Sequence, residues 1–284
     1  MTDLQKIEFD MLREFANICD KLGLTYYLVC GSALGVAKYN GFIPWDDDVD
    51  VALLRPDYEI FCDKAQSLLP PHLFLQNHMT DSRYPYLFSK LRNSETTFIE
   101  SGLTWLDMNH GVYIDIFPID GYPATIPEQQ KLEKRKRILK LQCLSAVKPN
   151  ANMRWMTRAF LRAERLCGCH KRTAKTLAKL TCLLSAYRPE SSDIWCNHGN
   201  WQGKLEYAPR EQYGNGTWAT FEGLRVRIPE QYDAYLTQKY GDWRADLPKE
   251  QQVGHHYAEI IDVERPYTHY NNFCKRTRTQ FKCI

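Results

Sequence analysis

Aspartates spaced two residues apart are the residues of this chain best suited to hold metal ions. Asp46, Asp48 and Asp50 stand directly before the apolar run 51–54. Side chains two residues apart in a strand point to the same face, so these three acids are predicted on one face and Asp47 on the other. The Cα atoms of Asp48 and Asp50 would lie roughly 7 Å apart. Two carboxylates at this separation can bind divalent cations together.

Two other kinds of site could use the same acids. An EF-hand loop would place Asp46, Asp48, Asp50 and Asp57 at its positions 1, 3, 5 and 12, but its position 6 needs glycine, and here that residue is Val51. A solvated acidic turn is the second alternative. It fits poorly, because the acids lead directly into apolar residues that require burial. A metal site is therefore the preferred interpretation.

A further carboxylate, Asp115, lies within the apolar run 112–117. An ionised carboxylate in mid-strand is rarely buried without a metal or an ion pair. Asp115 is therefore predicted either to complete the metal site or to pair with Lys90 or Arg92, and the sequence leaves both explanations open. Asp120, which precedes a glycine, is interpreted as structural.

The elements that must position these acids mix helices and strands over the first 123 residues. Helical spacing of apolar residues predicts helices at 4–22, 33–39 and 57–69. Apolar runs predict strands at 26–30, 46–54, 74–76, 86–92 and 112–117, the last ended by Pro118. This mixture predicts an α/β or α+β fold, with a mixed sheet flanked by helices.

Three segments are expected along the chain. Residues 1–124 would form the catalytic core. Residues 125–200 are rich in Lys, Arg and Leu at helical spacing without a convincing strand, and they predict an added helical lobe. Residues 201–284 would complete the active-site side of the core, with a hairpin near 221–229 and a helix over 230–240.

Composition and charge narrow the class of protein. The formal net charge of +3 is too small to indicate a nucleic-acid partner. The first residues lack the basic start and apolar run of a signal peptide, and no run of about 18 apolar residues predicts a membrane span. With ten cysteines that form no disulfide pattern, a cytoplasmic location is predicted. Cys167 and Cys169 are interpreted as free thiols rather than zinc ligands, because no second pair completes a site.

Two basic segments leave an alternative open. Residues 131–140 and the tail from Lys275 to Lys282 are rich in Lys and Arg. Both are predicted to be solvated surface, because their apolar stripe is thin. Peripheral contact with the inner membrane face is the alternative.

Several motifs closely resemble the LicD family. They are Cys30-Gly31-Ser32-Ala33-Leu34-Gly35, Gly41-Phe42-Ile43-Pro44-Trp45-Asp46-Asp47-Asp48-Val49-Asp50, Lys90-Leu91-Arg92, Tyr113-Ile114-Asp115-Ile116-Phe117-Pro118-Ile119-Asp120-Gly121, and Tyr240-Gly241-Asp242-Trp243 followed by Leu247-Pro248. The resemblance covers nearly the whole chain except about 125–200. This family includes bacterial phosphorylcholine transferases, is related to fukutin-type ribitol-phosphate transferases, and belongs to the DNA polymerase β-like nucleotidyltransferase superfamily.

The resemblance implies an enzyme with a nucleotidyltransferase-like core. It would transfer a phosphoryl-alcohol group, most commonly phosphocholine from CDP-choline, and release CMP. The acceptor would be a hydroxyl of a cell-surface glycan or its lipid-linked precursor, in lipopolysaccharide, teichoic acid or capsule. Two Mg²⁺ ions, with Mn²⁺ as the alternative, would be held by Asp48, Asp50 and Asp115, with Asp46 as a fourth candidate ligand.

The resemblance and the residue types also suggest phosphate contacts. Backbone N–H groups of Gly31 and Ser32, at the start of a helix, would hold a phosphate. Lys38, Lys90 and Arg92 are candidate ligands of the donor diphosphate, because Lys90 and Arg92 alternate onto one strand face. A solvated basic edge is the alternative for these cations.

Aromatic rings and histidines complete the candidate site. Trp45 and Tyr113 could contact a choline ammonium, because this cation can lie over an aromatic ring but donates no hydrogen bond. Both could equally be ordinary core aromatics. His255 and His256 are candidates for phosphate contact or proton transfer.

Two other functions remain open from the sequence. With the same acids holding the metals, an acceptor hydroxyl could instead attack the α-phosphate of an NTP and release pyrophosphate, as in nucleotidyltransferases. A non-catalytic nucleotide- or glycan-binding relative is the third possibility, although all three acids are present. The sequence does not distinguish choline phosphate from other phosphoryl alcohols.

Overall fold

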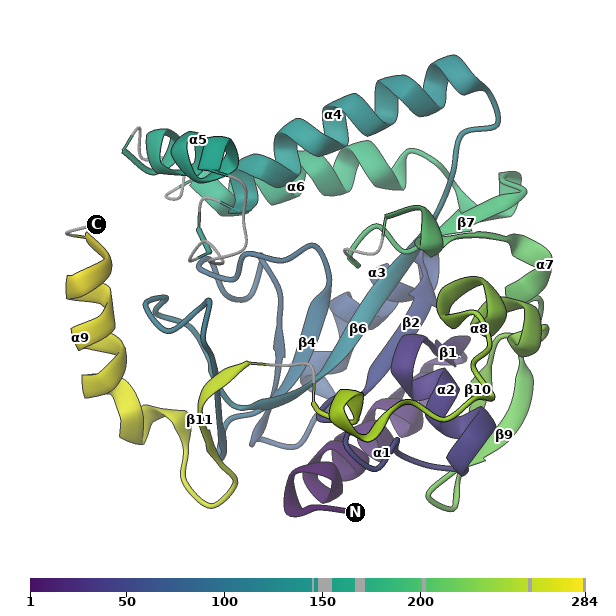
Figure 1. Ribbon diagram of the computed structural model, residues 1–284, viewed down its shortest axis with the longest axis horizontal. Coiled ribbons are helices and arrows are strands. Elements are labelled where there is room, and N and C mark those ends of the chain that lie inside the picture. Colours follow the sequence, from purple (N-terminus) through teal and green to yellow (C-terminus); the bar gives the residue numbers. More distant parts are fainter. Residues whose placement is uncertain (145, 148–154, 167–171, 201–202, 255–256, 283–284) are drawn as a thin grey trace.

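A mixed sheet forms the centre of the computed structural model, and helices pack around it (Figure 1). The structure describes residues 1–144, 146–147, 155–166, 172–200, 203–254 and 257–282. The helices are α1 (Asp3–Leu22), α2 (Cys30–Tyr39), α3 (Arg55–Lys64), η1 (Ala65–Ser67), α4 (Ile126–Leu144), α5 (Trp155–Leu166), α6 (Thr173–Ser185), η3 (Pro189–Ser191), η4 (Gly203–Glu206), α7 (Arg210–Tyr213), α8 (Tyr232–Tyr240), η5 (Lys249–Gln251), η6 (Tyr267–Tyr270) and α9 (Asn271–Lys282). The strands are β1 (Tyr26–Leu28), β2 (Asp50–Leu54), β3 (Leu73–Gln76), β4 (Ser89–Asn93), β5 (Thr97–Glu100), β6 (Val112–Gly121), β7 (Ile194–Cys196), β8 (Tyr207–Pro209), β9 (Thr217–Phe221), β10 (Leu224–Ile228) and β11 (Ala258–Asp262). The predicted α/β class is confirmed.

The order of strands in the main sheet is β1-β2-β6-β4-β3, with β7 and β8 added at the end of β6. The β2–β6 pair is parallel, whereas the β1–β2, β4–β6 and β3–β4 pairs are antiparallel. The register places Asp50 of β2 and Lys90 of β4 on either side of Asp115 of β6. Two predicted metal ligands and one predicted cation thus lie on three adjacent strands.

Two helices cover one face of this sheet. The Phe15 ring of α1 lies 5.0 Å from the Phe61 ring of α3 and 5.2 Å from the Tyr26 ring of β1, measured between centroids. Contact between α1 and α3 means that both pack on the same side. α2 packs near α8, where the Cys30 N–H donates to the Tyr235 hydroxyl at 3.1 Å.

The first helix forms as its sequence predicts. Thr2 and Gln5 make a reciprocal capping box at the N-terminus, and Gly23 ends the helix in the left-handed region with φ 66°. Both features satisfy backbone groups that a helix end leaves unpaired. α1 then buries Met11, Phe15 and other apolar residues against the sheet.

The predicted strand over 46–54 is wrong for its first four residues, because β2 begins only at Asp50. Residues 46–49 form a loop, which we call the acidic loop. The Gln5 side-chain amide of α1 donates to the Asp46 carbonyl at 3.0 Å and holds this loop in place. The alternation of faces predicted for Asp46 to Asp50 therefore does not apply to the loop residues.

Strand β6 is longer than predicted and continues through Pro118 to Gly121. Pairing with β4 ends at Ile116, so the missing N–H of Pro118 falls beyond that partner strand. β4 itself begins at Ser89, three residues after the predicted start. The predicted helix over 57–69 begins at Arg55, ends at Lys64 and continues as η1.

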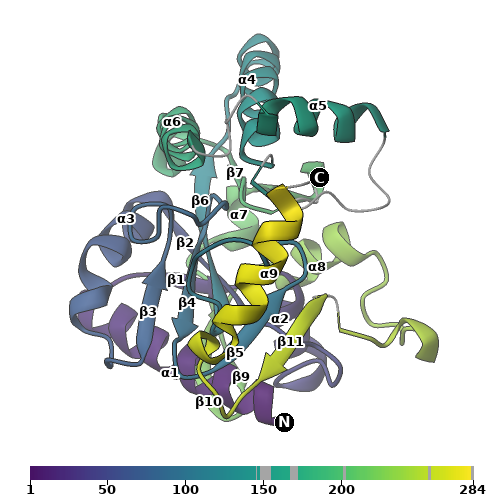
Figure 2. The same cartoon turned by 90° about the vertical axis from the view of Figure 1, so that its left-hand side faces the viewer.

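The segment after β6 forms helices α4, α5 and α6 at one end of the sheet, as both ribbon views show (Figures 1 and 2). Strand β7 then returns to pair with β6 at Asp120 and Gly121. β11 pairs with β5 in a separate two-stranded sheet and leads into α9. Within the described ranges, no helix is both long enough and apolar enough to cross a lipid bilayer.

Strands β9 and β10 form the predicted hairpin, with a two-residue turn at Glu222 and Gly223. Both turn residues have positive φ, 49° and 86°, as a tight hairpin turn requires. The turn packs on residues 40–42: the Glu222 N–H donates to the Asn40 carbonyl at 2.9 Å, and the Phe42 N–H donates to the Glu222 carboxylate at 3.1 Å. The hairpin thus supports the segment that leads into the acidic loop.

Candidate active site

Three carboxylates meet where β2 and β6 lie side by side. Asp48, Asp50 and Asp115 each bring one carboxylate oxygen to within 4.8 Å of the others. Asp50 opens β2 and Asp115 is its register partner in the parallel pair, so their side chains are neighbours on the sheet. Asp48 joins them from the acidic loop, although Asp48 is not part of the strand.

Backbone hydrogen bonds fix this arrangement. The Asp50 N–H donates to the Ser32 hydroxyl oxygen at 2.8 Å, and the Val29 N–H donates to the Asp50 carbonyl at 3.0 Å. The Asp115 N–H donates to the Val49 carbonyl at 2.8 Å. Ser32 is buried, and its hydroxyl therefore positions the start of β2 in this structure.

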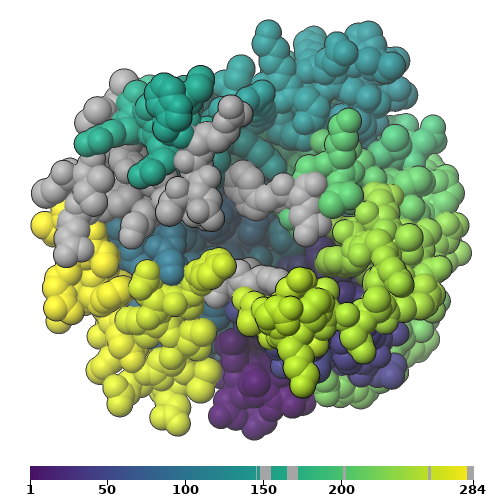
Figure 3. Space-filling model, viewed as in Figure 1, coloured from purple at the N-terminus to yellow at the C-terminus, as the bar shows by residue number. Residues whose placement is uncertain are grey.

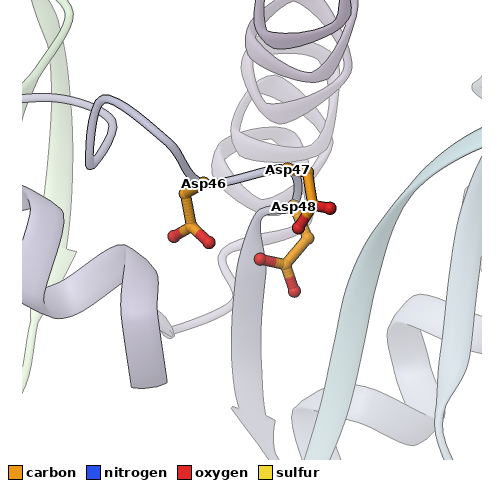
Figure 4. A group of neighbouring side chains, drawn as sticks. All are labelled: Asp46, Asp47 and Asp48. Atoms are coloured by element: carbon orange, nitrogen blue, oxygen red, sulfur yellow. The ribbon is translucent and has the colours of Figure 1, made fainter. Parts of the chain in front are cut away.

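The acidic loop brings Asp46, Asp47 and Asp48 together as well (Figure 4). One carboxylate oxygen of each lies within 4.8 Å of the other two. The prediction that Asp47 points away from its neighbours is therefore wrong, because no strand geometry governs these positions. A Cβ atom added to Gly254 would lie 2.6 Å from Asp47 Oδ2, so the C-terminal segment closes over this side chain.

Asp115 also forms the ion pair that the sequence left open. Its carboxylate forms an ion pair with the Lys90 ammonium at 2.9 Å, and the Glu100 carboxylate lies 3.7 Å from the same ammonium. Lys90 is 1% exposed, and its Nζ lies 3.1 Å from the centroid of the Tyr113 ring. Asp115 is thus both a member of the carboxylate cluster and the partner of a buried lysine.

Arg92 lies deeper in the sheet and is fully buried. Its guanidinium donates to the Gln76 side chain at 2.8 Å, to the Gly111 carbonyl at 2.7 Å and to the Glu100 carboxylate at 3.2 Å. Tyr113 is its register partner, and the Arg92 guanidinium carbon lies 4.6 Å from that ring centroid. The structure therefore leaves Arg92 and Tyr113 outside the cavity described next.

A cavity of about 970 Å³ opens above the carboxylate cluster. Among the residues that the structure describes, seven acidic residues line it, against two lysines. The acidic residues are Asp46, Asp48, Asp50, Glu100, Asp115, Asp242 and Glu250, and the lysines are Lys38 and Lys90. Seven aromatic rings also line it: Tyr39, Trp45, Tyr86, Phe88, Phe117, Tyr240 and Trp243. Figure 3 shows the molecule from this side, with a hollow near its centre. Such a lining favours cations, whether metal ions or an organic ammonium.

The remaining predicted contacts differ in how they reach the cavity. Gly31 lines it from the first turn of α2, and a Cβ atom there would lie 3.0 Å from Asp46 Oδ2. Lys38 also lines it, with its ammonium 2.9 Å from the Asp246 carboxylate. Trp45 is half-buried at the cavity wall, 6.3 Å from the Tyr39 ring. His255 and His256 lie outside the described residues, as do Cys167 and Cys169.

One network at the cavity wall escaped the sequence analysis. The buried Lys239 ammonium lies 2.6 Å from the Glu206 carboxylate and 3.8 Å from Cys30 Sγ. The Asn200 side-chain amide donates to the same sulfur at 3.4 Å. Burial raises the pKa of the Cys30 thiol well above its usual range, although Lys239 lowers it. No spacing in the sequence relates Lys239 to Glu206, since they come from α8 and η4.

A second overlooked residue, Glu8 of α1, lies 1% exposed behind the acidic loop. Its Oε2 atom has no hydrogen-bond partner among the described residues. Burial, and then the carboxylates of Asp48, Asp47 and Asp46, raise the pKa of Glu8 well above its ordinary value. The helical spacing of Glu8 with the apolar residues of α1 was the signal that could have identified this buried acid.

The chemistry of the donors fits a hard divalent cation. Asp48, Asp50 and Asp115 offer only carboxylate oxygens, which Mg²⁺ and Mn²⁺ prefer. Within this group of four, three negative side chains face one positive side chain, Lys90. The excess negative charge is what a bound cation would compensate.

Comparisons with known proteins agree with the motifs. Residues 23–141 match the sequence model described as the LicD/FKTN/FKRP nucleotidyltransferase domain. The chain is 26% identical over 268 residues to the lipopolysaccharide cholinephosphotransferase LicD of Haemophilus influenzae, an alignment that covers 91% of this chain and 97% of that protein. It is also 24% identical over 115 residues to the uncharacterised protein RP689 of Rickettsia prowazekii, which covers 40% of each chain. The segment 23–141 contains all three members of the carboxylate cluster.

Proposed function

Because residues 23–141 match the LicD-family model, we propose that this chain transfers phosphocholine from CDP-choline to a hydroxyl of a cell-surface glycan or its lipid-linked precursor. The acceptor oxygen would form a bond to the phosphorus that carries choline. The bond from that phosphorus to the bridging oxygen of the diphosphate would break, CMP would leave with that oxygen, and the hydroxyl proton would pass to the medium. The Haemophilus relative, aligned over nearly its whole length, supports the choice of phosphocholine and of lipopolysaccharide as the kind of acceptor.

The observation that carries the proposal is the meeting of Asp48, Asp50 and Asp115 at a cavity large enough for a nucleotide-linked donor. These carboxylates, with Asp46 beside them, would hold Mg²⁺. When bound, Mg²⁺ would neutralise the diphosphate and lower the pKa of the acceptor hydroxyl. The negative lining otherwise repels a diphosphate, so the proposal requires bound cations for donor binding.

Other residues of the chain would orient the reactants. The Lys90 ammonium, 2.9 Å from Asp115 Oδ1, would hold the Asp115 carboxylate in place at the cavity wall. The first turn of α2, at Gly31, would present backbone N–H groups to a phosphate. Lys38 would contribute a positive charge at the cavity mouth, although its ammonium is anchored to Asp246.

A choline head requires an aromatic surface and negative charge nearby. Trp45 lines the cavity beside Asp46 and meets both requirements. Tyr86 and Phe88 are less suited, because their rings already lie 5.9 Å and 5.7 Å from the Lys90 ammonium. Trp45 is therefore the proposed contact of the quaternary ammonium, and Tyr113, buried beneath Lys90, is not.

Product analysis tests the proposal. The purified protein is incubated with Mg²⁺, an acceptor lipopolysaccharide and either CDP-choline, CDP-ethanolamine, CDP-glycerol or CTP, and the products are identified by mass spectrometry. The expected result is CMP together with a phosphocholine-bearing glycan from CDP-choline, and neither product from Asp50→Asn. Pyrophosphate release from CTP would instead identify a nucleotidyltransferase. Nucleotide binding without any product would identify a non-catalytic relative.

A further inference from the structure

Helix α5 presents apolar side chains to solvent. Trp155 is 77% exposed, Met156 61% and Phe160 41%. Successive residues of an α-helix are rotated by about 100°, so Trp155, Met156 and Phe160 lie on one side of α5, together with Ala159 and Ala163. Buried Leu161 lies on the opposite side. Exposed Arg158 and Arg162 lie along one edge of the apolar side. The helix is therefore amphipathic with its apolar side outward, the reverse of an ordinary surface helix.

The lobe around this helix is strongly basic. Residues 126–185 contain 15 Lys or Arg and three Asp or Glu, a formal net charge of +12 in a chain whose total is +3. The rest of the chain is therefore negatively charged. Exposed basic side chains of the neighbouring α4 include Lys131, Lys134 and Arg135. Positive charge concentrated next to an exposed apolar helix face is complementary to an anionic lipid surface.

The position of α5 agrees with such a partner. α5 lies at the upper left of the face shown in Figure 3, the same face on which the cavity opens. In Figure 2, α5 projects to the right of α4 and α6, above the central sheet. A flat surface could therefore contact α5 without first displacing the core.

We propose that α5 docks in the plane of an anionic lipid bilayer, with Trp155, Met156 and Phe160 immersed at the interface and Arg158 and Arg162 facing lipid phosphates. Aromatic and apolar side chains at this depth gain from leaving water, and the arginines gain from anionic headgroups. This arrangement would place the cavity mouth beside the membrane. Binding to the bilayer does not depend on the transferase reaction, so it is tested without any substrate.

Vesicle sedimentation of the full chain provides the test. Vesicles of equal parts phosphatidylcholine and phosphatidylglycerol are expected to bind the protein, and vesicles of phosphatidylcholine alone to bind at least tenfold less. Replacing Trp155, Met156 and Phe160 together by serine is expected to lower the partition coefficient for anionic vesicles at least tenfold. The matched control is Trp218→Ser, which removes a 44% exposed tryptophan on the distant β9 and should leave binding unchanged. Circular dichroism checks that each variant keeps its helix content.

Charge is tested separately with Arg158→Glu and Arg162→Glu, which are expected to weaken binding to anionic vesicles while retaining all apolar residues. Equal vesicle binding by the wild type and the triple serine variant would overturn the proposal. So would light scattering showing that the wild type is a dimer and the triple variant a monomer, since a second copy would then be the partner of this face. Vesicle binding and light scattering are both measured without substrate, so a variant that has lost catalytic activity can still be tested in both.

Discussion

Replacing Asp115 by asparagine separates its two roles, metal ligand and partner of Lys90. The change removes a carboxylate 2.9 Å from an ammonium that is 1% exposed. Removing one partner of a buried ion pair costs about 3–5 kcal/mol of unfolding free energy. Glu100 remains 3.7 Å from the ammonium and compensates part of its charge. The loss should therefore lie at the lower end, about 3 kcal/mol.

A loss of about 3 kcal/mol should lower Tm by about 6–12 °C. Each kcal/mol shifts Tm by about 2–4 °C in proteins somewhat smaller than this one. Melting is followed by calorimetry in EDTA, so that metal binding does not contribute. Turnover is measured with saturating Mg²⁺ at a temperature where the variant is folded. It should fall on the order of a thousandfold if Asp115 also holds the metal.

Asp48→Asn is the matched comparison, because Asp48 is half-buried in the loop. Its turnover should fall similarly, whereas its unfolding free energy should change by less than about 1 kcal/mol. An Asp115→Asn variant that melts early but retains full turnover would show that Asp115 serves only the ion pair. An unchanged Tm would show that the Lys90 contact contributes little to stability, and our account of this buried pair would then fail.

Three further outcomes are expected. Arg55→Ala should lower the unfolding free energy, measured by urea titration, by about 3–5 kcal/mol. The fully buried Asp120 carboxylate would lose the guanidinium that donates to it at 2.6 and 2.7 Å. A change below about 1 kcal/mol would contradict this prediction. Glu8→Gln should stabilise the protein at about pH 7 but not at about pH 4. The pKa of Glu8 is higher in the folded protein than in the unfolded chain, so the wild type loses stability as the pH rises above the unfolded pKa. Glutamine does not ionise, so the variant avoids this loss. Equal stability of the two proteins at both pH values would refute it. Trp45→Ala should raise KM for CDP-choline about tenfold and KM for CDP-glycerol much less, because only choline carries a quaternary ammonium; equal effects on both donors would remove Trp45 from the choline contact.

The sequence predicted the carboxylate cluster because its members obey local rules. Asp50 begins an apolar strand and Asp115 lies in the middle of another. A carboxylate at either position needs a metal ion or an ion pair, because the neighbouring residues are buried. The parallel pairing of β2 with β6 then placed them in register. The class of fold followed from the same alternation of apolar runs and amphipathic helices.

The failures have long-range causes. The acidic loop was predicted as strand because its two-residue spacing suits a strand, but the Gln5 amide holds it from another element. Arg92 shares a strand face with Lys90, yet antiparallel pairing places it opposite Tyr113, two residues farther from the cluster. The alternation of side chains in a strand predicts which face of the sheet a residue lies on, but not how far along the strand it lies from the cavity. The pairing of Lys239 with Glu206 had no sequence signal at all.

The contact between the hairpin turn and residues 40–42 bears on how such enzymes can diverge. Phe42 and Glu222 are 180 positions apart, and Cys30 and Lys239 are 209 positions apart, whereas the matched family domain ends at residue 141. A recombination event that exchanged residues 1–141 between relatives would separate Phe42 and Cys30 from the turn and the lysine that contact them. Inheritance of residues 1–141 as an independent module is therefore disfavoured. Chimeras of this chain with a relative should retain a formed site only when the hairpin and α8 come from the same parent as the acidic loop.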